Sequence, residues 1–210
     1  MNTRFSILLG GGLLPTQRLA AQTRGTRAIA ADSGILHAET LNLPVELWVG
    51  DFDSTPPDAM PRFARVPREA WPADKDRTDG EIAADAAITR GASSLVFVGG
   101  LGGQTDHALG HFTLALRVAR QGVKVLITSG DEEAYPILAG THEFDLPPGS
   151  RISLIAFTDL TGLTLEGVRW PLQAADIPLG STWTLSNIAE GPVRIQLQSG
   201  YGIAVAYPAD

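Results

Sequence analysis

The sequence predicts an α/β fold: an open, mostly parallel sheet with flanking helices, followed by a small antiparallel β-sandwich. Two observations predict this division. Up to about residue 130, short apolar runs alternate with stretches of helical periodicity, which is typical of β-α-β units. From about residue 140, short β-like runs follow one another with turn residues between them. We therefore place the two domains at residues 1–135 and 136–210.

In the first domain, the expected strands end at glycine or polar residues, and helices connect them in right-handed crossovers. The expected strands span residues 5–9, 28–31, 47–49, 95–98 and 123–127. Thr78 and Glu81 have the spacing of a capping box and predict the start of a helix. The other expected helices span residues 15–24, 34–41 and 106–120.

The second domain shows no helical stretch. Turn signals such as Pro147-Pro148-Gly149 and Pro178-Leu179-Gly180 separate its β-like runs. These runs span residues 143–146, 152–157, 163–165, 182–185, 193–197 and 203–207.

The composition is that of an ordinary globular protein, with 44% apolar and 19% charged residues among 210. No apolar run approaches the ~20 residues of a membrane-spanning helix, so we expect no membrane segment. The net charge is −7 and no Lys/Arg cluster stands out, which disfavours nucleic acid as a partner. The absence of cysteine excludes disulfides and thiolate metal sites and fits a cytoplasmic location. We interpret residues 5–9 as a first strand rather than as a signal peptide.

Six aspartates of the first domain lie next to predicted strand ends or helix starts. Three follow strands directly, two lie at the start of the helix that Thr78 opens, and one follows the glycine-rich turn after 95–98. Because the carboxyl ends of parallel strands share the edge at which open α/β sheets bind ligands, we expect these carboxylates around one crevice. The six are Asp32, Asp51, Asp53, Asp76, Asp79 and Asp106.

A group of carboxylates is unfavourable unless a cation neutralises it or some of them are protonated. Ligands that are all hard oxygen favour Mg²⁺ or Mn²⁺ over zinc. Glycine-rich turns at residues 10–12 and 99–103 supply backbone N–H groups that suit phosphates. Each aspartate alone also fits a turn or a helix cap, so the prediction of phosphoryl or pyrophosphoryl transfer depends on the combination.

Other motifs are missing. Neither glycine-rich turn matches a P-loop or the dinucleotide fingerprint. His107 and His111 have the i,i+4 spacing of a zinc pair, but the glutamate of H-E-x-x-H is absent, which disfavours zinc.

Four segments in this order carry a family resemblance: Ala-Asp-Ser-Gly at 31–34, Gly-Asp-Phe-Asp-Ser at 50–54, Asp-Arg-Thr-Asp at 76–79 and Gly-Gly-Leu-Gly-Gly-Gln-Thr-Asp-His at 99–107. The chain resembles the thiamine pyrophosphokinases on these segments, which are highly specific in combination. Looser similarity to the thiamine-binding β-domain of that family continues at residues 167–172, 178–180 and 185–187.

The resemblance implies an ATP- and Mg²⁺-binding catalytic domain at 1–135, a thiamine-binding β-sandwich at 136–210, and a homodimer with sites between subunits. The implied reaction moves the diphosphate of ATP to the hydroxyl of thiamine and releases AMP. The implied Mg²⁺ ligands are Asp32, Asp51, Asp53 and Asp79. The implied catalytic residues are Asp51, Asp53, Asp79 and Asp106, with either Asp79 or Asp106 as the base. Expected ATP contacts are Asp32, Asp76, Gly100, Gly102 and Gly103, and expected thiamine contacts are Ser186 and Asn187.

The sequence departs from the family pattern in the glycine-rich turn. Gln104 stands where the family usually has arginine, which removes a bidentate phosphate contact that Lys75 or Arg77 could replace. Trp170 and Trp183 are candidates to stack on cationic thiamine, with burial in a core or interface as the alternative. Two alternative functions remain open: pyrophosphate transfer to another hydroxymethyl heterocycle such as a pterin, and a non-catalytic thiamine or nucleotide sensor.

Overall fold

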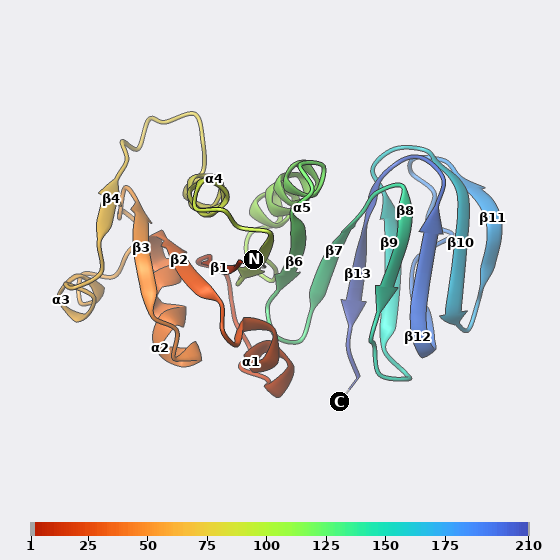
Figure 1. The fold of residues 1–210 in the computed structure, drawn as a ribbon, viewed down its shortest axis with the longest axis horizontal. Coiled ribbons are helices and arrows are strands. Elements are labelled where there is room, and N and C mark those ends of the chain that lie inside the picture. The colour runs from red at the N-terminus through yellow and green to blue at the C-terminus, as the bar shows by residue number, and fades with distance from the viewer. Residues whose placement is uncertain (1–2, 210) are drawn as a thin grey trace. The chain divides into compact units, whose positions relative to one another are not determined.

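The computed structural model describes residues 3–209. It has a mixed α/β fold and divides into two compact units, which Figure 1 draws in chain order from red to blue. The first unit holds the described residues up to Leu114 together with Gly122–Gly130. The second unit holds Ala115–Gln121 and the described residues from Asp131 onward.

The strands of the first unit form a parallel sheet in the order β6-β5-β1-β2-β3-β4. Strand order runs outward in both directions from β1, so the topological switch point lies between β1 and β5. A ligand crevice is expected there, at the carboxyl ends of these two strands. The strands are β1 (Arg4–Leu8), β2 (Arg27–Ala31), β3 (Val45–Gly50), β4 (Arg68–Ala70), β5 (Ser94–Val98) and β6 (Lys124–Thr128).

Helices connect these strands, and local signals set where they begin. The Thr78 hydroxyl accepts a hydrogen bond from the Glu81 backbone N–H at 3.3 Å, which confirms Thr78 as the predicted N-cap of α4. Thr16 caps α1 in the same way. The helices are α1 (Gln17–Thr23), the 3₁₀ helix η1 (Asp32–Leu36), α2 (His37–Leu41), α3 (Ala59–Arg62), α4 (Asp79–Thr89) and α5 (Thr105–Ala119). Among the described residues, no helix is both long enough and apolar enough to span a bilayer.

The second unit is antiparallel in all its strand pairs. Burial alternates along β9 and β12, as expected for strands with one face on a core that contains Leu154, Leu163 and Ile195. The strands are β7 (Glu133–Ile137), β8 (Gly140–Phe144), β9 (Arg151–Ala156), β10 (Leu160–Val168), β11 (Leu172–Ile177), β12 (Asn187–Leu197) and β13 (Gly202–Tyr207).

The strand predicted at 182–185 is wrong, because this segment forms turns. Thr184 nevertheless bonds Leu154 of β9 through both its backbone C=O and its hydroxyl. The sequence reasoning also missed β4, β7 and β11. β4 is three exposed residues, β7 contains a proline, and β11 has a single β-branched residue, so none carries a clear strand signal.

Candidate active site

Two glycine-rich turns meet at the switch point of the first unit. The Gly11 N–H donates to the Gly99 C=O at 3.1 Å, which joins the turn after β1 to the turn after β5. A Cβ on Gly11 would lie 2.3 Å from that same oxygen, so a side chain at this position would separate the turns. His37 Nε2 lies 2.9 Å from the Gly11 C=O and adds a second support.

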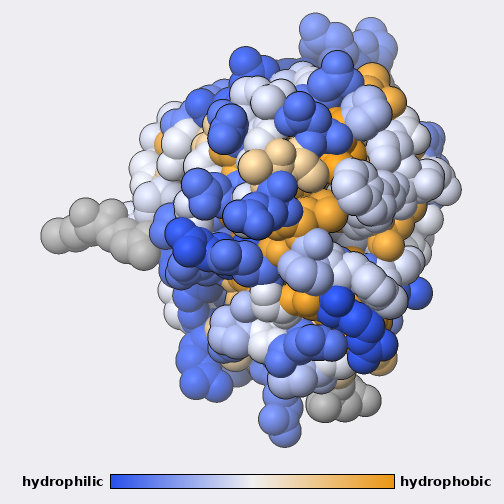
Figure 2. All heavy atoms as spheres, turned by 90° about the vertical axis from the view of Figure 1, so that its right-hand side faces the viewer, coloured by the Kyte–Doolittle hydropathy of each residue, from blue (hydrophilic) through white to orange (hydrophobic). Residues whose placement is uncertain are grey.

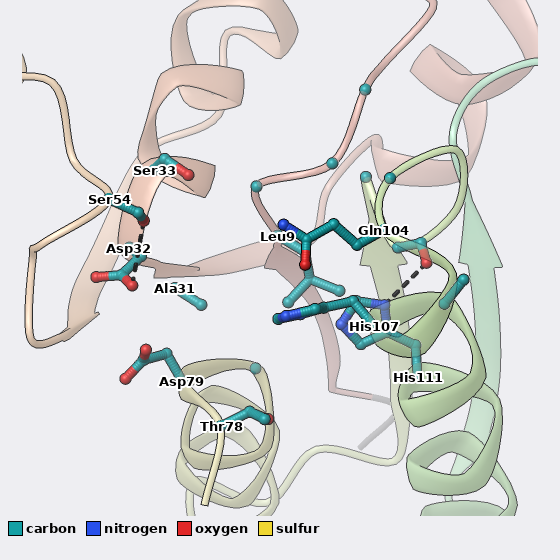
Figure 3. A pocket seen from close by; sticks show the side chains of 18 of the residues that line it. Leu9, Ala31, Asp32, Ser33, Ser54, Thr78, Asp79, Gln104, His107 and His111 are labelled. Carbon is teal, nitrogen blue, oxygen red and sulfur yellow. Dashed lines mark hydrogen bonds between the residues drawn. The ribbon is translucent and has the colours of Figure 1, made fainter. Parts of the chain in front are cut away.

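A pocket of about 480 Å³ opens beside these turns. Figure 3 shows Asp32, Ser54 and Asp79 on one side of it, and Gln104, His107 and His111 on the other. Backbone of Gly10–Gly12 and of Gly99, Gly100 and Gly103 also lines the pocket. One wall is therefore acidic, and the other carries polar groups of α5 and of the turn that precedes it.

Three aspartates from separate segments converge beside the pocket, of which Asp32 and Asp79 line it. Asp32 begins η1 after β2, Asp51 follows β3, and Asp79 begins α4. One carboxylate oxygen from each lies within 4.8 Å of the others. The predicted convergence of strand-end and helix-start carboxylates is present for these three residues.

Backbone conformation and hydrogen bonds fix the orientation of the Asp32 carboxylate. Asp32 has a left-handed conformation with φ 46°, and its C=O accepts a hydrogen bond from the Trp48 indole N–H at 2.9 Å. Its Oδ1 accepts from the Phe52 N–H at 2.9 Å, and its Oδ2 accepts from the Ser54 hydroxyl at 3.3 Å. Strained backbone of this kind persists where surrounding contacts hold it, often at functional sites.

Two of the three carboxyls have pKa values shifted in opposite directions. Burial, followed by repulsion from Asp79, raises the pKa of Asp32 to about 6. The pKa of Asp51 is lowered, first by the hydrogen bond from the Asp53 N–H and then by Lys75. Asp32 thus bears the cost of burial beside like charges, whereas a hydrogen bond and Lys75 favour the ionised form of Asp51.

Lys75 is the cation that lies against this cluster. Its Nζ is 3.2 Å from Asp51 Oδ2 and 3.1 Å from Asp79 Oδ1. Burial alone would lower the pKa of Lys75, but pairing with Asp79 and Asp51 outweighs burial and raises it. Asp79 Oδ1 is buried, with Lys75 Nζ as its charged neighbour. A buried carboxylate oxygen within an all-oxygen set is a fitting ligand for Mg²⁺.

The other predicted acidic residues lie outside this group. Asp53, Asp76 and Asp106 are exposed, and none of them lines the pocket. Asp53 contributes its backbone N–H to Asp51 at 3.2 Å. Asp106 Oδ1 accepts from the N–H of His107 at the start of α5. Of the predicted glycines, Gly100 and Gly103 line the pocket and Gly102 does not.

The α5 wall contains residues that sequence reasoning considered only as a zinc pair. His111 Nδ1 lies 2.8 Å from the Gly100 C=O; since a carbonyl only accepts, Nδ1 carries a hydrogen. Burial lowers the pKa of His111, which favours the neutral ring with an unprotonated Nε2. The i,i+4 spacing of His107 and His111 was the signal that both face one side of a helix.

In the second unit, Asn187 is 6% exposed, and its side chain forms hydrogen bonds with the backbone of Trp170. Its Oδ1 accepts from the Trp170 N–H at 3.1 Å, and its Nδ2 donates to the Trp170 C=O at 2.7 Å. Ser186 has φ 59° and donates its N–H to the Ser153 hydroxyl at 2.9 Å.

Trp170 and Trp183 are 58% and 63% exposed, so the alternative that they belong to the core of this chain is wrong. Leu179 is a third large exposed apolar residue of this unit. On the face drawn in Figure 2, hydrophobic side chains emerge among hydrophilic ones.

Comparisons with known proteins match both parts of the chain. Residues 21–127 match the family model of the thiamin pyrophosphokinase catalytic domain, and residues 141–201 match that of the vitamin B1 binding domain. A thiamine pyrophosphokinase of Bacillus subtilis (strain 168) is 31% identical over 149 residues, which is 69% of each chain.

Solved structures agree with these matches. The thiamine pyrophosphokinase of Bacillus subtilis superposes with a TM-score of 0.87 at 26% identity, covering 99% of this chain and 100% of that one. The enzyme of Geobacillus thermodenitrificans gives a TM-score of 0.81 at 26% identity, covering 100% of this chain and 98% of that one. The fold and the matched models define a transferase of the kinase class. The chain belongs to the thiamine pyrophosphokinase family.

Proposed function

We propose that the chain transfers the diphosphate of ATP to the hydroxyl of thiamine, giving thiamine diphosphate and AMP, and that it requires Mg²⁺. The observation that carries this proposal is the convergence of Asp32, Asp51 and Asp79 beside a pocket walled by glycine backbone at a topological switch point. Carboxylates hold Mg²⁺ while leaving positions for substrate phosphates. Glycine N–H groups can approach those phosphates closely.

The proposed ligands are Asp32, Asp51 and Asp79, with exposed Asp53 as a fourth member next to Asp51. The hard oxygen donors, including the buried Asp79 Oδ1, fit a Mg²⁺ ion. When bound, Mg²⁺ neutralises charge on the transferred diphosphate and on the departing AMP.

The chain's own groups position the reactants. The thiamine hydroxyl oxygen forms a bond to the β-phosphorus while the bond from that phosphorus to the oxygen bridging to the α-phosphorus breaks. The electron pair of that bond leaves on AMP, and the hydroxyl proton passes to a carboxylate or to solvent. Of the two proposed bases, Asp79 lines the pocket and Asp106 does not, so we assign this role to Asp79. Positioning and electrostatics supply most of the rate in such transfers.

The domain roles belong to the same proposal. Residues 1–135 would bind ATP and Mg²⁺, and residues 136–210 would form a β-sandwich that binds thiamine. A homodimer with shared sites follows from the family resemblance, with no role for nucleic acid or membrane. The cytoplasmic location remains a prediction from the cysteine-free composition.

The test is a matched assay of AMP and thiamine diphosphate from ATP, Mg²⁺ and thiamine. We expect equal amounts of both products and loss of both with a chelator. Asp51→Asn should lower turnover at least about 100-fold, because it removes a charged ligand, whereas the exposed control Asp58→Asn should retain it. Diphosphate transfer to a hydroxymethyl pterin instead would support the pterin alternative. Binding of both substrates without turnover would support a sensor.

A further inference from the structure

We propose that Lys75 is an internal cation of the metal site. Its ammonium neutralises Asp51 and Asp79 before a divalent cation enters, is displaced by that cation, and then binds a substrate phosphate in the pocket. This inference rests on the metal site of the proposed function and assigns a positioning role to a lysine outside the acidic motif.

The contacts of Lys75 are those of a neutralising cation. Its ammonium lies 3.2 Å from Asp51 and 3.1 Å from Asp79, which are two of the three converging carboxylates. Its side chain is only 10% exposed, so water screens these charges less than at an open surface. The ammonium therefore reduces the net negative charge of the cluster that the three carboxylates form.

A divalent cation would compete with the ammonium for this place. Mg²⁺ lies about 2.1 Å from its carboxylate oxygens, and Mn²⁺ uses the same class of ligand. Since Lys75 Nζ already lies against Asp51 and Asp79, an ion bound by both would lie within a few ångströms of Nζ. Repulsion between the two cations at that distance offsets much of the attraction that holds Lys75 to the two carboxylates, which favours movement of its flexible side chain.

The pocket is the space into which the displaced Lys75 ammonium would move. Lys75 lines the pocket together with glycine backbone and Gln104. Its one other hydrogen bond among the described residues goes to the Pro72 C=O at 3.3 Å, only three residues away, so this contact does not fix the ammonium to the sheet. Arg77 also lines the pocket but is paired with Asp85 at 3.4 Å. Lys75 is thus placed to supply the cationic phosphate contact that Gln104 does not.

The first experiment measures Mn²⁺ binding to the nucleotide-free protein by calorimetry, for wild type, Lys75→Met and the exposed control Lys124→Met. Removing an internal competitor should tighten Mn²⁺ binding about tenfold in Lys75→Met. Lys124→Met loses the same charge away from the cluster and should stay within about twofold of wild type. Lys75→Arg keeps the competing charge and should also bind like wild type.

The second experiment measures pyrophosphate binding in saturating Mn²⁺. Lys75→Met should bind pyrophosphate several-fold more weakly while it binds the metal more tightly, and a merely structural lysine would not give these opposite shifts. If Lys75→Met fails to fold in a chelator, we expect Mn²⁺ to restore its thermal unfolding transition, and Lys75→Gln serves as the second variant. Mn²⁺ affinity that is unchanged or weaker in Lys75→Met would overturn the proposed displacement. Pyrophosphate affinity that is unchanged in this variant would overturn the proposed phosphate contact. Absence of Mn²⁺ binding in wild type and all variants would instead refute the proposed metal site.

Discussion

Asp32 Oδ1 accepts a hydrogen bond from the Phe52 backbone N–H at 2.9 Å, and both residues have left-handed backbone, with φ of 46° and 65°. This bond joins the start of η1 to the loop after β3. Gly50 makes room for it: a Cβ there would lie 2.2 Å from Asp32 Oδ1. The orientation of a proposed metal ligand thus depends on a neighbour without a side chain.

Gly50→Ala should displace the Asp32 carboxylate. We expect Mn²⁺ affinity and turnover to fall at least about tenfold, together with a loss of about 1–3 kcal/mol in the free energy of unfolding. The backbone contributes to that loss, because Gly50 has φ 151°. Gly91→Ala is the matched control: Gly91 also has positive φ, at 83°, but a Cβ there meets open space. Calorimetry and denaturant unfolding check both variants, and equal metal affinity in the two would contradict the dependence of Asp32 on Gly50.

His111 should make stability depend on pH on the acid side. Burial lowers its pKa in the folded chain, so the unfolded chain binds the proton more readily. The stabilisation is therefore fully present above the unfolded pKa of about 6.5 and is lost as the pH falls through the folded pKa. His111→Asn should flatten this acid-side loss, since asparagine does not titrate and its amide can still donate to the Gly100 C=O.

Urea unfolding from pH 7.5 down to pH 5 measures this effect. His107→Asn is the control, because His107 lies one helical turn away and is exposed. The slope of stability against pH should shrink in His111→Asn and stay close to wild type in His107→Asn. A slope unchanged by loss of the buried ring would show that other groups set the acid response.

The first unit could be predicted from sequence better than the second, and the reasons are local. Strand ends followed by Gly or Asp marked the sheet edge, and the Thr78–Glu81 spacing marked the start of α4. Asp53 and Asp76 share motifs with Asp51 and Asp79, and Asp106 belongs to the glycine-rich segment, yet all three are exposed. Their direction depends on backbone conformations such as φ 65° at Phe52, which residue spacing does not encode.

The strands of the second unit were harder to predict from sequence, because long-range pairing determines them. β11 pairs with β10 although its residues are mostly poor strand formers. Residues 182–185 have a β-like composition, but only Thr184 bonds β9, and the segment remains a turn. Lys75 is also separated in sequence from Asp51, so only the folded chain shows their contact.

Asn187→Ala should first disturb the backbone of Trp170. Asn187 is buried and bonds both the N–H and the C=O of Trp170, so its loss leaves backbone groups unpaired and costs about 1–3 kcal/mol. We expect a shift in tryptophan fluorescence and a raised KM for thiamine, with kcat changed less. Gln196→Ala removes an exposed amide from the same strand and should change neither quantity. A raised thiamine KM without any change in stability or fluorescence would instead indicate that Asn187 contacts thiamine directly.

Gln104→Arg should strengthen phosphate binding. Gln104 lines the pocket opposite the acidic wall, and an arginine there would offer a phosphate two parallel hydrogen bonds that an amide cannot match. We expect pyrophosphate affinity in the presence of Mn²⁺ to rise about five- to tenfold, because a charge-assisted bidentate contact is worth roughly 1–1.4 kcal/mol more than a neutral one. Gln121→Arg adds the same charge at an exposed position after α5 and should have little effect at physiological salt.

If Lys75 supplies the phosphate contact, Gln104→Arg should also recover most of the pyrophosphate affinity lost in Lys75→Met, and calorimetry on the double variant measures that recovery. A gain in Gln104→Arg alone, without recovery in the double variant, would mean that the two positions serve different phosphates.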